Sequence, residues 1–355
     1  MRLRFQFRPY RLSFRSPVRT AHGRWVDREG VIVRVEDGAG AVGWGEAAPL
    51  PDFGTETVAE VVAACGGFGE WTTAAELNGV PARLGCLRHA LVAALAEVGR
   101  VPTEAGSDQP AASGRPYVAV AALLPAGRAV LAQIPGRVEM GFRVFKWKVG
   151  VGDLADELSL LDDVCAALPS GAKLRLDANG AWERRHAERW LERCADRPVE
   201  FVEQPCAATE RRSWTDAGAW SKADDLLLGL AGDFPTPLAL DESIVGEGDV
   251  ERWLGAGWPG LFVIKPSLLA DVTGTLARLA KARAPVVFSS ALDTAVGART
   301  ALRTALAWAG EPRAAGFGVW PLFVDGRCNG PMAAPFIRAE DVAHLDPEAV
   351  WSALS

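Results

Sequence analysis

The sequence predicts an α/β protein in which a small N-terminal α+β domain is followed by a modified (β/α)8 barrel of the TIM type. Two observations lead to this prediction. Strand-like and then helical runs fill the first 100 residues, and short apolar runs alternate with helical stretches from residue 116 onward. Alternating strands and helices imply a parallel sheet, and eight strand–helix units in about 210 residues match a closed barrel. A chain of 355 residues has room for both parts.

The N-terminal domain is predicted over the first 100 residues. The run LRFQFRPYRLSF alternates loosely between apolar and polar residues, and GVIVRVEDGAGAVGWGEAA has the pattern of a hairpin with its turn at Asp37-Gly38. Two later runs, at 55–65 and 83–99, place apolar residues at helical spacing. Residues 101–115 are rich in Pro, Gly, Ser and Ala, so we expect a linker there.

The barrel is predicted over residues 116–320 from eight short apolar runs, each a candidate strand. They are YVAVAALL (117–124), RVFKWKV (143–149), KLRLDAN (173–179), VEFVEQP (199–205), LALDES (238–243), LFVIKPS (261–267), APVVFSS (284–290) and GFGVW (316–320). Helical runs such as DLADELSLLDDVCAAL separate them. An open doubly wound sheet is the alternative, but no GxGxxG follows the first run to support it.

An ionisable residue ends four of the apolar runs. These residues are Asp177, Glu203, Asp241 and Lys265. Barrel active sites form at the carboxyl ends of several strands, so the three carboxylates are predicted to converge on one mouth. Each residue alone has an ordinary explanation as a turn former, a helix cap or a solvated charge. Three converging carboxylates, however, would repel one another without a cation, and oxygen ligands without Cys or His suit Mg²⁺ or Mn²⁺.

The stretch FKWKVG places two lysines one residue apart in an apolar run. In a strand, Lys146 and Lys148 share one face, and Phe145, Trp147 and Val149 share the other. A strand with one solvated face would explain the pair without any function. In a barrel, the lysines would face the interior and the apolar residues would pack on the outer helices. Neighbouring ammonium groups and partial burial both disfavour charge, so one lysine can be neutral near pH 7 and act as a base.

Composition narrows the classes of function. The chain is 49% hydrophobic and 23% charged, as is typical of a globular protein, and its net charge of −6 argues against a nucleic-acid partner. It has no signal-peptide pattern and no apolar run near 18 residues, so we expect a cytoplasmic protein without a membrane span. Six widely spaced cysteines without CxxC predict free thiols, and four scattered histidines argue against a His-based metal site or a Ser-His-Asp triad. The sequence implies no protein partner.

The motifs KWK, LDAN, VEQP, LDES, IKPS and FSSALDTAVG occur in an order and spacing that resembles the muconate-lactonising branch of the enolase superfamily. Within that branch the chain is most similar to the o-succinylbenzoate synthase family. The resemblance covers nearly the whole chain and implies an enolase-like fold. In that fold, residues 1–100 form a capping domain before the barrel, and residues 321–355 pack back on it.

The resemblance also implies an activity and a cofactor. Asp177, Glu203 and Asp241 would ligate Mg²⁺, with Mn²⁺ as an alternative. The enzyme would be a carbon–oxygen lyase acting on a small carboxylate. Its reaction would be the syn-dehydration of 2-succinyl-6-hydroxy-2,4-cyclohexadiene-1-carboxylate to 2-succinylbenzoate in menaquinone biosynthesis, through a metal-stabilised enediolate.

Roles for the three lysines follow from the same resemblance. Lys148 would abstract the proton α to the substrate carboxylate and return it to the departing hydroxyl. Lys146 would lower the pKa of Lys148 and steady negative charge. Lys265 would face the other side of the substrate, stabilising the anion in a synthase or acting as a second base in a racemase.

Further candidates near the site are less specific, since each also has an ordinary structural explanation. Two could support the metal ligands, two could touch the succinyl tail at the end of the seventh strand, and arginines of the RTAHGRW segment could meet a carboxylate in a closing loop. They are Asn179 and Glu242, Ser289 and Ser290, and Arg24 with Arg19.

Two other functions remain open at this stage. An N-succinylamino acid racemase or dipeptide epimerase would need the same metal ligands and lysines, because both reactions begin with the same proton abstraction. A non-enzymatic barrel holding a structural cation is the alternative outside enzymes. Solvent deuterium exchange into a carboxylate substrate would separate it from the enzymes, because a scaffold would catalyse none.

Overall fold

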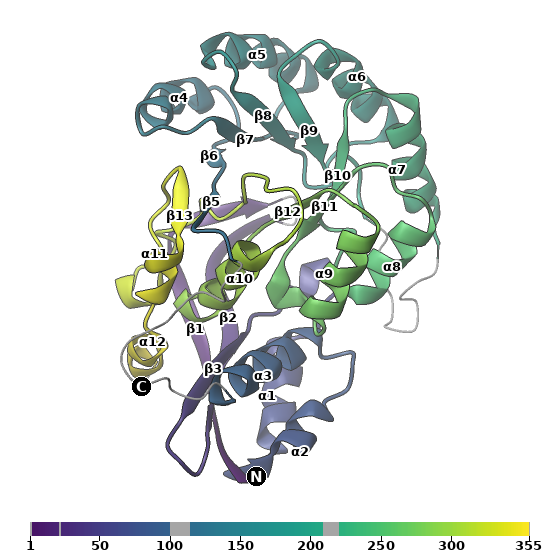
Figure 1. The fold of residues 1–355 in the computed structure, drawn as a ribbon. Coiled ribbons are helices and arrows are strands. Elements are labelled where there is room, and N and C mark those ends of the chain that lie inside the picture. The colour runs from purple at the N-terminus through teal and green to yellow at the C-terminus, as the bar shows by residue number, and fades with distance from the viewer. Residues whose placement is uncertain (1, 21–22, 100–113, 209–219, 355) are drawn as a thin grey trace.

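The computed structural model describes residues 2–20, 23–99, 114–208 and 220–354 (Figure 1). Almost all of the predicted linker, 101–115, lies outside the described residues. The fold class predicted from the sequence is confirmed: an α+β domain precedes a barrel of parallel strands with helices on its outside.

The N-terminal domain is built on an antiparallel sheet with the strand order β3-β2-β1-β4. Its strands are β1 (Arg2–Thr20), β2 (Gly23–Glu36), β3 (Val42–Ala47) and β4 (Trp71–Thr73). The predicted hairpin between β2 and β3 is present. The backbone N–H of Asp37 donates to Ala41 O at 3.0 Å, and the Asp37 carboxylate accepts from the N–H groups of Ala39 and Ala41.

Three helices pack on this sheet: α1 (Val58–Gly66), α2 (Ala74–Asn78) and α3 (Gly85–Val98). α3 lies within the predicted run 83–99, and α1 ends one residue beyond the predicted run 55–65. Helix α3 approaches β3 at Gly43 and Gly45, where a Cβ atom would lie 1.9 Å from the carbonyl oxygens of Ala94 and Ala90. Glycine at these two positions therefore permits the close packing of helix on strand.

The second domain contains seven parallel strands in the order β6-β7-β8-β9-β10-β11-β12. The strands are β6 (Ala122–Leu124), β7 (Val144–Lys148), β8 (Lys173–Asp177), β9 (Val199–Glu203), β10 (Leu238–Leu240), β11 (Leu261–Ile264) and β12 (Val286–Phe288). The helices of this domain are α4 (Ala129–Glu139), α5 (Leu154–Ala167), α6 (Arg184–Cys194), α7 (Lys222–Asp233), α8 (Glu247–Gly255), α9 (Val272–Lys281) and α10 (Ala295–Ala307).

The ring of strands closes without a regular eighth strand, so the prediction of a strand at 316–320 is wrong. Parallel bridges join Val120 to Ala315 and Ser289 to Gly316 instead. At Gly316 a Cβ would lie 2.6 Å from the Ser289 hydroxyl, so the chain passes too close to its neighbour for a side chain there. Glycine also weakens a strand, because it has no side chain to pack.

The first predicted barrel strand, 117–124, is split into β5 (Tyr117–Ala119) and β6. Between them, the N–H of Val120 donates to Pro335 O and that of Ala121 donates to Ala315 O. β5 pairs with β13 (Phe336–Arg338) rather than with the barrel.

The inside of the barrel is filled below its carboxyl end. An apolar cluster lies there, made of Phe201, Ala239, Leu261, Val263 and Val287. Arg175, which is 1% exposed, joins it: its guanidinium donates to Glu200 at 2.7 Å and to Ala314 O at 2.6 Å, and lies over the Phe201 ring. This packed layer, which we call the barrel floor, lies beneath the side chains at the mouth and supports them.

Two buried charged residues of the N-terminal domain bind the loop between β12 and α10. The Glu46 carboxylate accepts from the N–H groups of Thr294 at 3.0 Å and Gly297 at 2.8 Å, in the first turn of α10. The Arg28 guanidinium donates to Ala291 O at 3.1 Å and to carbonyls of its own domain. We call this set the interdomain clamp, and it fixes the two domains to each other.

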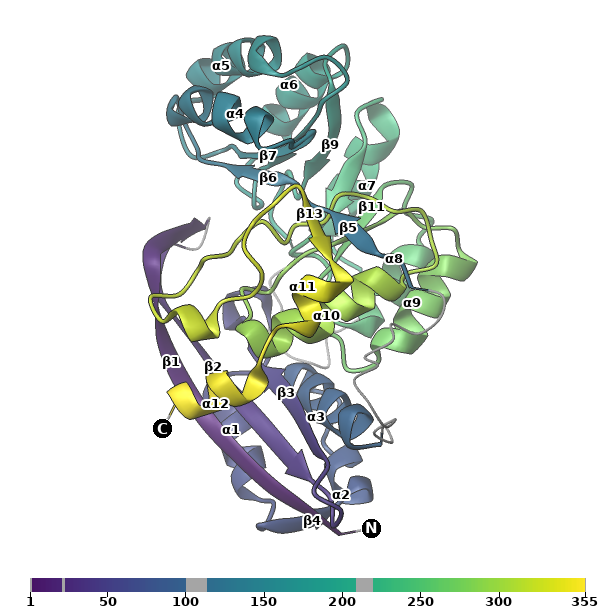
Figure 2. The ribbon, with the colours of Figure 1, turned by 60° about the vertical axis from the view of Figure 1, so that its left-hand side comes forward.

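The chain after residue 320 returns to the N-terminal domain. The rings of Phe14 and Phe323 stack at 5.7 Å, and the Arg8 guanidinium lies 4.0 Å from the centre of a Trp351 ring. Trp351 belongs to α12 (Pro347–Ala353), which follows α11 (Ala339–Ala343) and lies along the ribbon of β1 and β2 (Figure 2). On these contacts we propose the division into residues 1–100, 101–115, 116–320 and 321–355.

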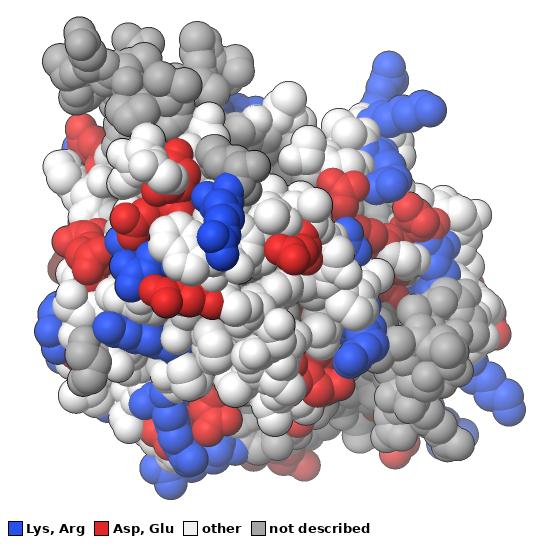
Figure 3. Space-filling model, turned by 90° about the horizontal axis from the view of Figure 1, so that it is seen from below, with Lys and Arg blue, Asp and Glu red and all other residues white. Residues whose placement is uncertain are grey.

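The surface shows no concentration of one charge on the face seen from below, where acidic and basic side chains are interspersed (Figure 3). Among the described helices, none combines the length and the apolar character that a membrane crossing requires.

Candidate active site

The strand pattern places ionisable residues at the carboxyl ends of neighbouring barrel strands. Asp177 is the last residue of β8 and pairs in register with Glu203, the last residue of β9. Asp241 directly follows β10, and Lys265 directly follows β11. Because parallel strands end on the same side of a sheet, all four side chains gather at one mouth. Glu203, Asp241 and Lys265 are each less than one-tenth exposed.

β7 turns its two lysines toward the same mouth. Phe145 and Trp147 are fully buried on the opposite face, and the Trp147 ring meets Trp190 of α6 edge to face at 6.2 Å. The expectation that Lys146 and Lys148 face the barrel interior therefore agrees with the burial along β7. In register, Lys148 pairs with Asp177 on β8.

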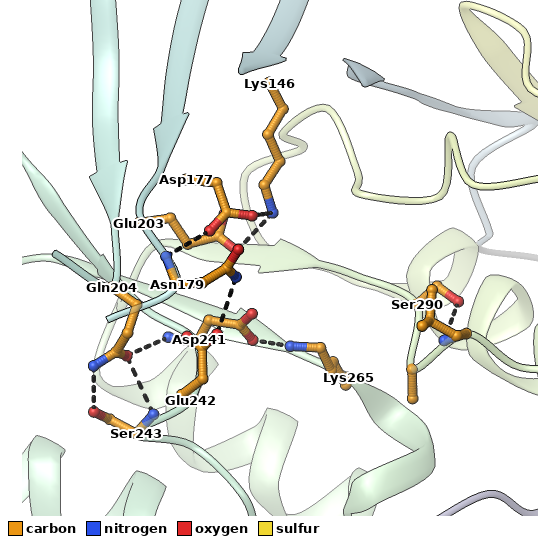
Figure 4. A network of polar contacts seen from close by, with 12 residues as sticks. Lys146, Asp177, Asn179, Glu203, Gln204, Asp241, Glu242, Ser243, Lys265 and Ser290 are labelled. Atoms are coloured by element: carbon orange, nitrogen blue, oxygen red, sulfur yellow. Dashed lines mark hydrogen bonds and ion pairs between the residues drawn. The ribbon is translucent and has the colours of Figure 1, made fainter. Parts of the chain in front are cut away.

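Two lysines form ion pairs with the carboxylates from different sides (Figure 4). Lys146 Nζ lies 2.9 Å from Asp177 Oδ2 and 2.6 Å from Glu203 Oε1, so one ammonium bridges two carboxylates. Lys265 pairs with Asp241. In Figure 4, Lys146 approaches from β7 and Lys265 from the segment after β11, with the carboxylates between them.

The surroundings shift the pKa values of the two lysines of β7 in opposite directions. Burial acts to lower the pKa of Lys146, but the charges of Asp177 and Glu203 outweigh it and hold that pKa above its usual value. Burial lowers the pKa of Lys148, and the Lys146 charge adds to the effect against the opposing charge of Asp177. Lys146 is thus kept cationic, and Lys148 is the lysine more easily found as the neutral amine.

The pKa values of Glu203 and Asp177 are also shifted in opposite directions. Burial raises the pKa of Glu203 to about 8, with the charges of Asp177 and Asp241 acting in the same direction against Lys146. Burial also acts to raise the pKa of Asp177, but the contact with Lys146 dominates and lowers it. Glu203 is therefore the carboxyl of this pair that holds its proton more tightly, and a cation beside it would oppose the rise in its pKa.

Asn179 and Glu242 connect the ends of β8 and β10. Asn179 Nδ2 donates to Glu242 Oε1 at 3.0 Å, and its backbone N–H donates to Asp177 Oδ1 at 3.2 Å. Burial and the charges of Asp241 and Asp177 raise the pKa of Glu242 to about 8. Asn179 Oδ1 and Glu242 Oε2 are buried without a hydrogen-bond partner. Both residues thus lie beside the three carboxylates, with acceptor oxygens left over.

The remaining residues predicted from the sequence are two serines, whose contacts lie away from the three carboxylates, and two arginines. Ser290 donates to Asp293 Oδ2 at 3.2 Å and accepts from the N–H of Leu292 at 2.9 Å, so its hydroxyl is engaged within its own loop. The Ser289 side chain packs against Gly316. Arg24 is exposed on β2, and the side chain of Arg19 is outside what the structure describes.

Two residues at the site were missed by the sequence analysis. The side chain of Gln204, directly after Glu203, binds the loop after β10 (Figure 4). Phe53 of the N-terminal domain ends a 3-10 turn at Pro51–Phe53, and Lys265 Nζ lies 4.8 Å from the centre of its ring. Only the VEQP motif offered a signal for Gln204. Nothing local could have linked Phe53 to a lysine more than 200 residues away.

The residues present suit a hard divalent cation. Among the described residues, no three Asp, Glu, His or Cys side chains are already arranged as metal ligands, since lysines lie against the carboxylates. The donors nevertheless consist of carboxylate oxygens without sulfur or imidazole, which matches Mg²⁺. The four carboxyl groups at the mouth outnumber its three lysines, and the unpartnered oxygens of Asn179 and Glu242 also favour a further cation. Asp177, Glu203 and Asp241 therefore fit Mg²⁺.

Comparisons with known proteins agree with this geometry. Residues 1–97 match a family model described as MenC, N-terminal domain, and residues 129–314 match one described as enolase C-terminal domain-like. The o-succinylbenzoate synthase of Thermosynechococcus vestitus is 39% identical over 322 residues, 89% of this chain and 92% of its own. The chain belongs to the o-succinylbenzoate synthase family of the enolase superfamily. The resemblance predicted from the motifs is confirmed.

Further relatives support the assignment of this family member. The o-succinylbenzoate synthase of Thermobifida fusca is 30% identical over 357 residues, which cover 96% of this chain and 93% of its own. The crystal structure of the o-succinylbenzoate synthase from Thermosynechococcus elongatus BP-1, complexed with Mg in the active site, superposes with a TM-score of 0.79 at 35% identity, covering 99% of both chains. The L-Ala-D/L-Glu epimerase of Bacillus subtilis has a TM-score of 0.74 at 20% identity, covering 94% of this chain and 95% of its own, and shows the shared fold alone.

Proposed function

We propose that this family member is a carbon–oxygen lyase that dehydrates 2-succinyl-6-hydroxy-2,4-cyclohexadiene-1-carboxylate to 2-succinylbenzoate, a step of menaquinone biosynthesis. Its family membership supports the activity. The observation that supports the chemistry best is the placement of three carboxylates on consecutive strand ends between lysines that approach from two sides.

Asp177, Glu203 and Asp241 are proposed as the ligands of Mg²⁺, the metal found in the active site of the similar Thermosynechococcus structure. When bound, Mg²⁺ would supply positive charge where the substrate carboxylate gains negative charge. Asn179 and Glu242 are proposed to hold the ligand loops in place, because they join the ends of β8 and β10.

Lys148 is proposed as the base. As the neutral amine it takes the proton from the carbon next to the carboxylate and becomes an ammonium. The carbon–oxygen bond on the same face then breaks, and Lys148 returns the proton to the departing hydroxyl, which leaves as water. The ring becomes aromatic and the amine is regenerated, so the step needs no other acid.

Lys146 and Lys265 are proposed to act through charge. Lys146, kept cationic by Asp177 and Glu203, favours the neutral form of Lys148. Lys265, beside Asp241, would place an ammonium on the other side of the substrate and stabilise the anion that Lys148 generates. A positioned base supplies roughly 10²–10⁴-fold, while enzymes commonly reach 10⁶-fold or more. Charge stabilisation must therefore supply the rest.

Contacts to the substrate tail are proposed at the other side of the mouth. Ser289 and Ser290 directly follow β12 and are buried, and Arg24 is exposed near the end of the β1–β2 ribbon. These three residues are candidates for binding the succinyl group, whose carboxylate favours hydroxyl and guanidinium donors.

The decisive experiment is turnover of the cyclohexadiene precursor by the purified protein with Mg²⁺, alongside a sample treated with EDTA. We expect rapid loss of the precursor absorbance with Mg²⁺ and none after EDTA. A folded, Mg²⁺-bound sample without turnover would refute the dehydratase and leave only the superfamily chemistry.

A second activity is suggested by Lys265. A lysine on each side of the bound carboxylate is the arrangement that a racemase or epimerase requires, because one removes a proton and the other returns it from the opposite face. Solvent deuterium incorporation into an N-succinylamino acid or a dipeptide would test this activity. Exchange without inversion would show that Lys265 does not donate a proton.

The cellular setting is part of the proposal. The six cysteines are free, and five of them are buried, which suits a reducing cytoplasm. The substrate is a small carboxylate, and the proposed chemistry requires no nucleic acid, membrane or protein partner.

A further inference from the structure

Gln204 occupies an unusual position beside the proposed metal ligands. It directly follows Glu203, it is 0% exposed, and its backbone φ is +37°. Residues other than glycine seldom adopt positive φ, and such strain persists where the surroundings hold the residue in place. Strain of this kind gathers at functional sites, so the contacts that hold Gln204 are relevant to function.

The side chain of Gln204 uses its full hydrogen-bonding capacity. Oε1 accepts from the backbone N–H of Asp241 at 3.1 Å and from that of Ser243 at 3.2 Å. Nε2 donates to Ser243 Oγ and to Cys206 O, both at 3.0 Å. A glutamine amide offers two acceptor sites and two donors, and all four are satisfied here. One side chain therefore ties the segment after β9 to the segment after β10.

The backbone of Gln204 extends the same connection. Its N–H donates to Ala239 O on β10 at 2.8 Å, and its carbonyl accepts from the N–H of Gly180, after β8, at 2.7 Å. Gln204 thus contacts the segments that carry Asp177 and Asp241 and is covalently joined to Glu203. Among the residues at this mouth it is placed to fix the spacing of all three carboxylates.

We propose that Gln204 is a positioning residue that sets the placement of Asp241 relative to Glu203 and thereby the affinity for Mg²⁺. This inference rests on the proposed function, since it assumes that these carboxylates hold the metal. An apolar side chain at position 204 would leave the buried N–H groups of Asp241 and Ser243 without their acceptor, and the loop would move to satisfy them. Partners that orient metal ligands typically change metal affinity or activity by 10–100-fold when removed.

The test compares two variants that each replace a side-chain amide, one buried and one partly buried, and lose equivalent hydrogen bonds in different places. Gln204→Met keeps the length of the side chain and removes all four bonds. Asn329→Leu is the matched control, because Asn329 Oδ1 also accepts from two backbone N–H groups, of Leu322 and Phe323, and its Nδ2 also donates to two carbonyls. Mg²⁺ affinity is measured by calorimetry on each full-length protein, with thermal stability measured in parallel.

We expect both variants to lose stability and only Gln204→Met to bind Mg²⁺ about 10–100-fold more weakly. Its Mg²⁺ activation constant should rise in step, while KM for the precursor changes less. Gln204→Glu keeps an acceptor for the N–H groups of Asp241 and Ser243 but turns an acceptor oxygen toward Cys206 O, so it should recover only part of the affinity. Equal Mg²⁺ affinity in Gln204→Met and the wild type would overturn the positioning role and leave a purely structural one.

If Gln204→Met does not fold, Ser243→Ala removes only one of the four bonds. It should weaken Mg²⁺ binding about two- to tenfold, the range expected for one hydrogen bond, and unchanged binding would overturn the proposal. Failure of the wild type itself to bind Mg²⁺ and turn over the precursor would refute the proposed function instead. The two failures are therefore distinguishable.

Discussion

The interdomain clamp and the barrel mouth both bury charge, but they compensate it differently. Glu46 in the clamp is bound by the backbone N–H groups of Thr294 and Gly297 and by the Tyr10 hydroxyl. Glu203 at the mouth is bound by Lys146, whose own charge depends on its surroundings. Backbone donors cannot titrate or leave. The clamp is thus suited to holding two domains together, and the mouth is suited to exchanging partners when metal and substrate arrive.

The largest effect is expected from removing the base at the mouth. Lys148→Ala should lower kcat/KM by at least about 10²–10⁴-fold, because the proton then loses its proposed acceptor. Steady-state turnover of the precursor measures it. Lys173→Ala is the control, since Lys173 begins β8 with a side chain that is 58% exposed and should change activity less than about twofold. Near-normal turnover by Lys148→Ala would show that another group is the base.

The next largest effect is on Mg²⁺ affinity, and it should differ between two glutamates of the same strand, β9. Glu203→Gln should weaken Mg²⁺ binding by at least about 10–100-fold, the cost already typical of groups that only support a ligand. Glu200→Gln should bind Mg²⁺ like the wild type, because Glu200 pairs with Arg175 in the barrel floor. Calorimetric titration of both variants measures the difference. Equal loss of affinity in the two would mean that the strand, and not the Glu203 carboxylate, matters.

A smaller effect, on stability alone, is expected in the clamp. Glu46→Gln replaces one acceptor oxygen by a donor that faces N–H groups, which should cost about 1–3 kcal/mol of unfolding free energy. Urea denaturation measures it, and Mg²⁺ affinity should stay unchanged. Glu29→Gln, whose side chain is 51% exposed, should stay within about 0.5 kcal/mol of the wild type. A loss of Mg²⁺ affinity in Glu46→Gln would show that the two regions are not independent.

The smallest effect is a pH dependence of the metal-free protein. A carboxyl with a raised folded-state pKa stabilises the fold fully below its unfolded value of 4.5, and this contribution is lost as pH rises through the folded value, about 8 for Glu203. Melting temperatures in EDTA should therefore fall more steeply between about pH 5 and pH 8 in the wild type than in Glu203→Gln. Parallel curves would contradict the raised pKa.

The same comparison explains what the sequence could predict. Asp177, Glu203, Asp241 and Lys265 were found because each directly follows or ends an apolar strand run, and parallel strands bring such ends together. Lys146 and Lys148 were found from the period of two within β7. These patterns are local in the sequence, so they can be recognised without a structure. The splitting of 117–124 and the loss of the strand at 316–320 arose from contacts with Pro335, Ala315 and Ser289, which no local pattern contains.

The clamp and the support of the mouth were not predictable in this way. Glu46 meets Thr294 across 248 residues, and Arg28 meets Ala291 across 263. A buried acidic residue in the predicted hairpin gave no indication of its partner. Gln204 lay inside a recognised motif, but its four hydrogen bonds depend on how β9 and β10 end beside each other.

A single Mg²⁺ titration, followed by heat and by precursor turnover on the same preparation, would test the proposed site most directly. We expect one Mg²⁺ per chain, with turnover rising in proportion to occupancy in the wild type and both signals lost in Glu203→Gln. Turnover that persists in EDTA, or Mg²⁺ binding that is as tight in Glu203→Gln as in the wild type, would contradict the assignment of the barrel mouth as the metal-dependent active site.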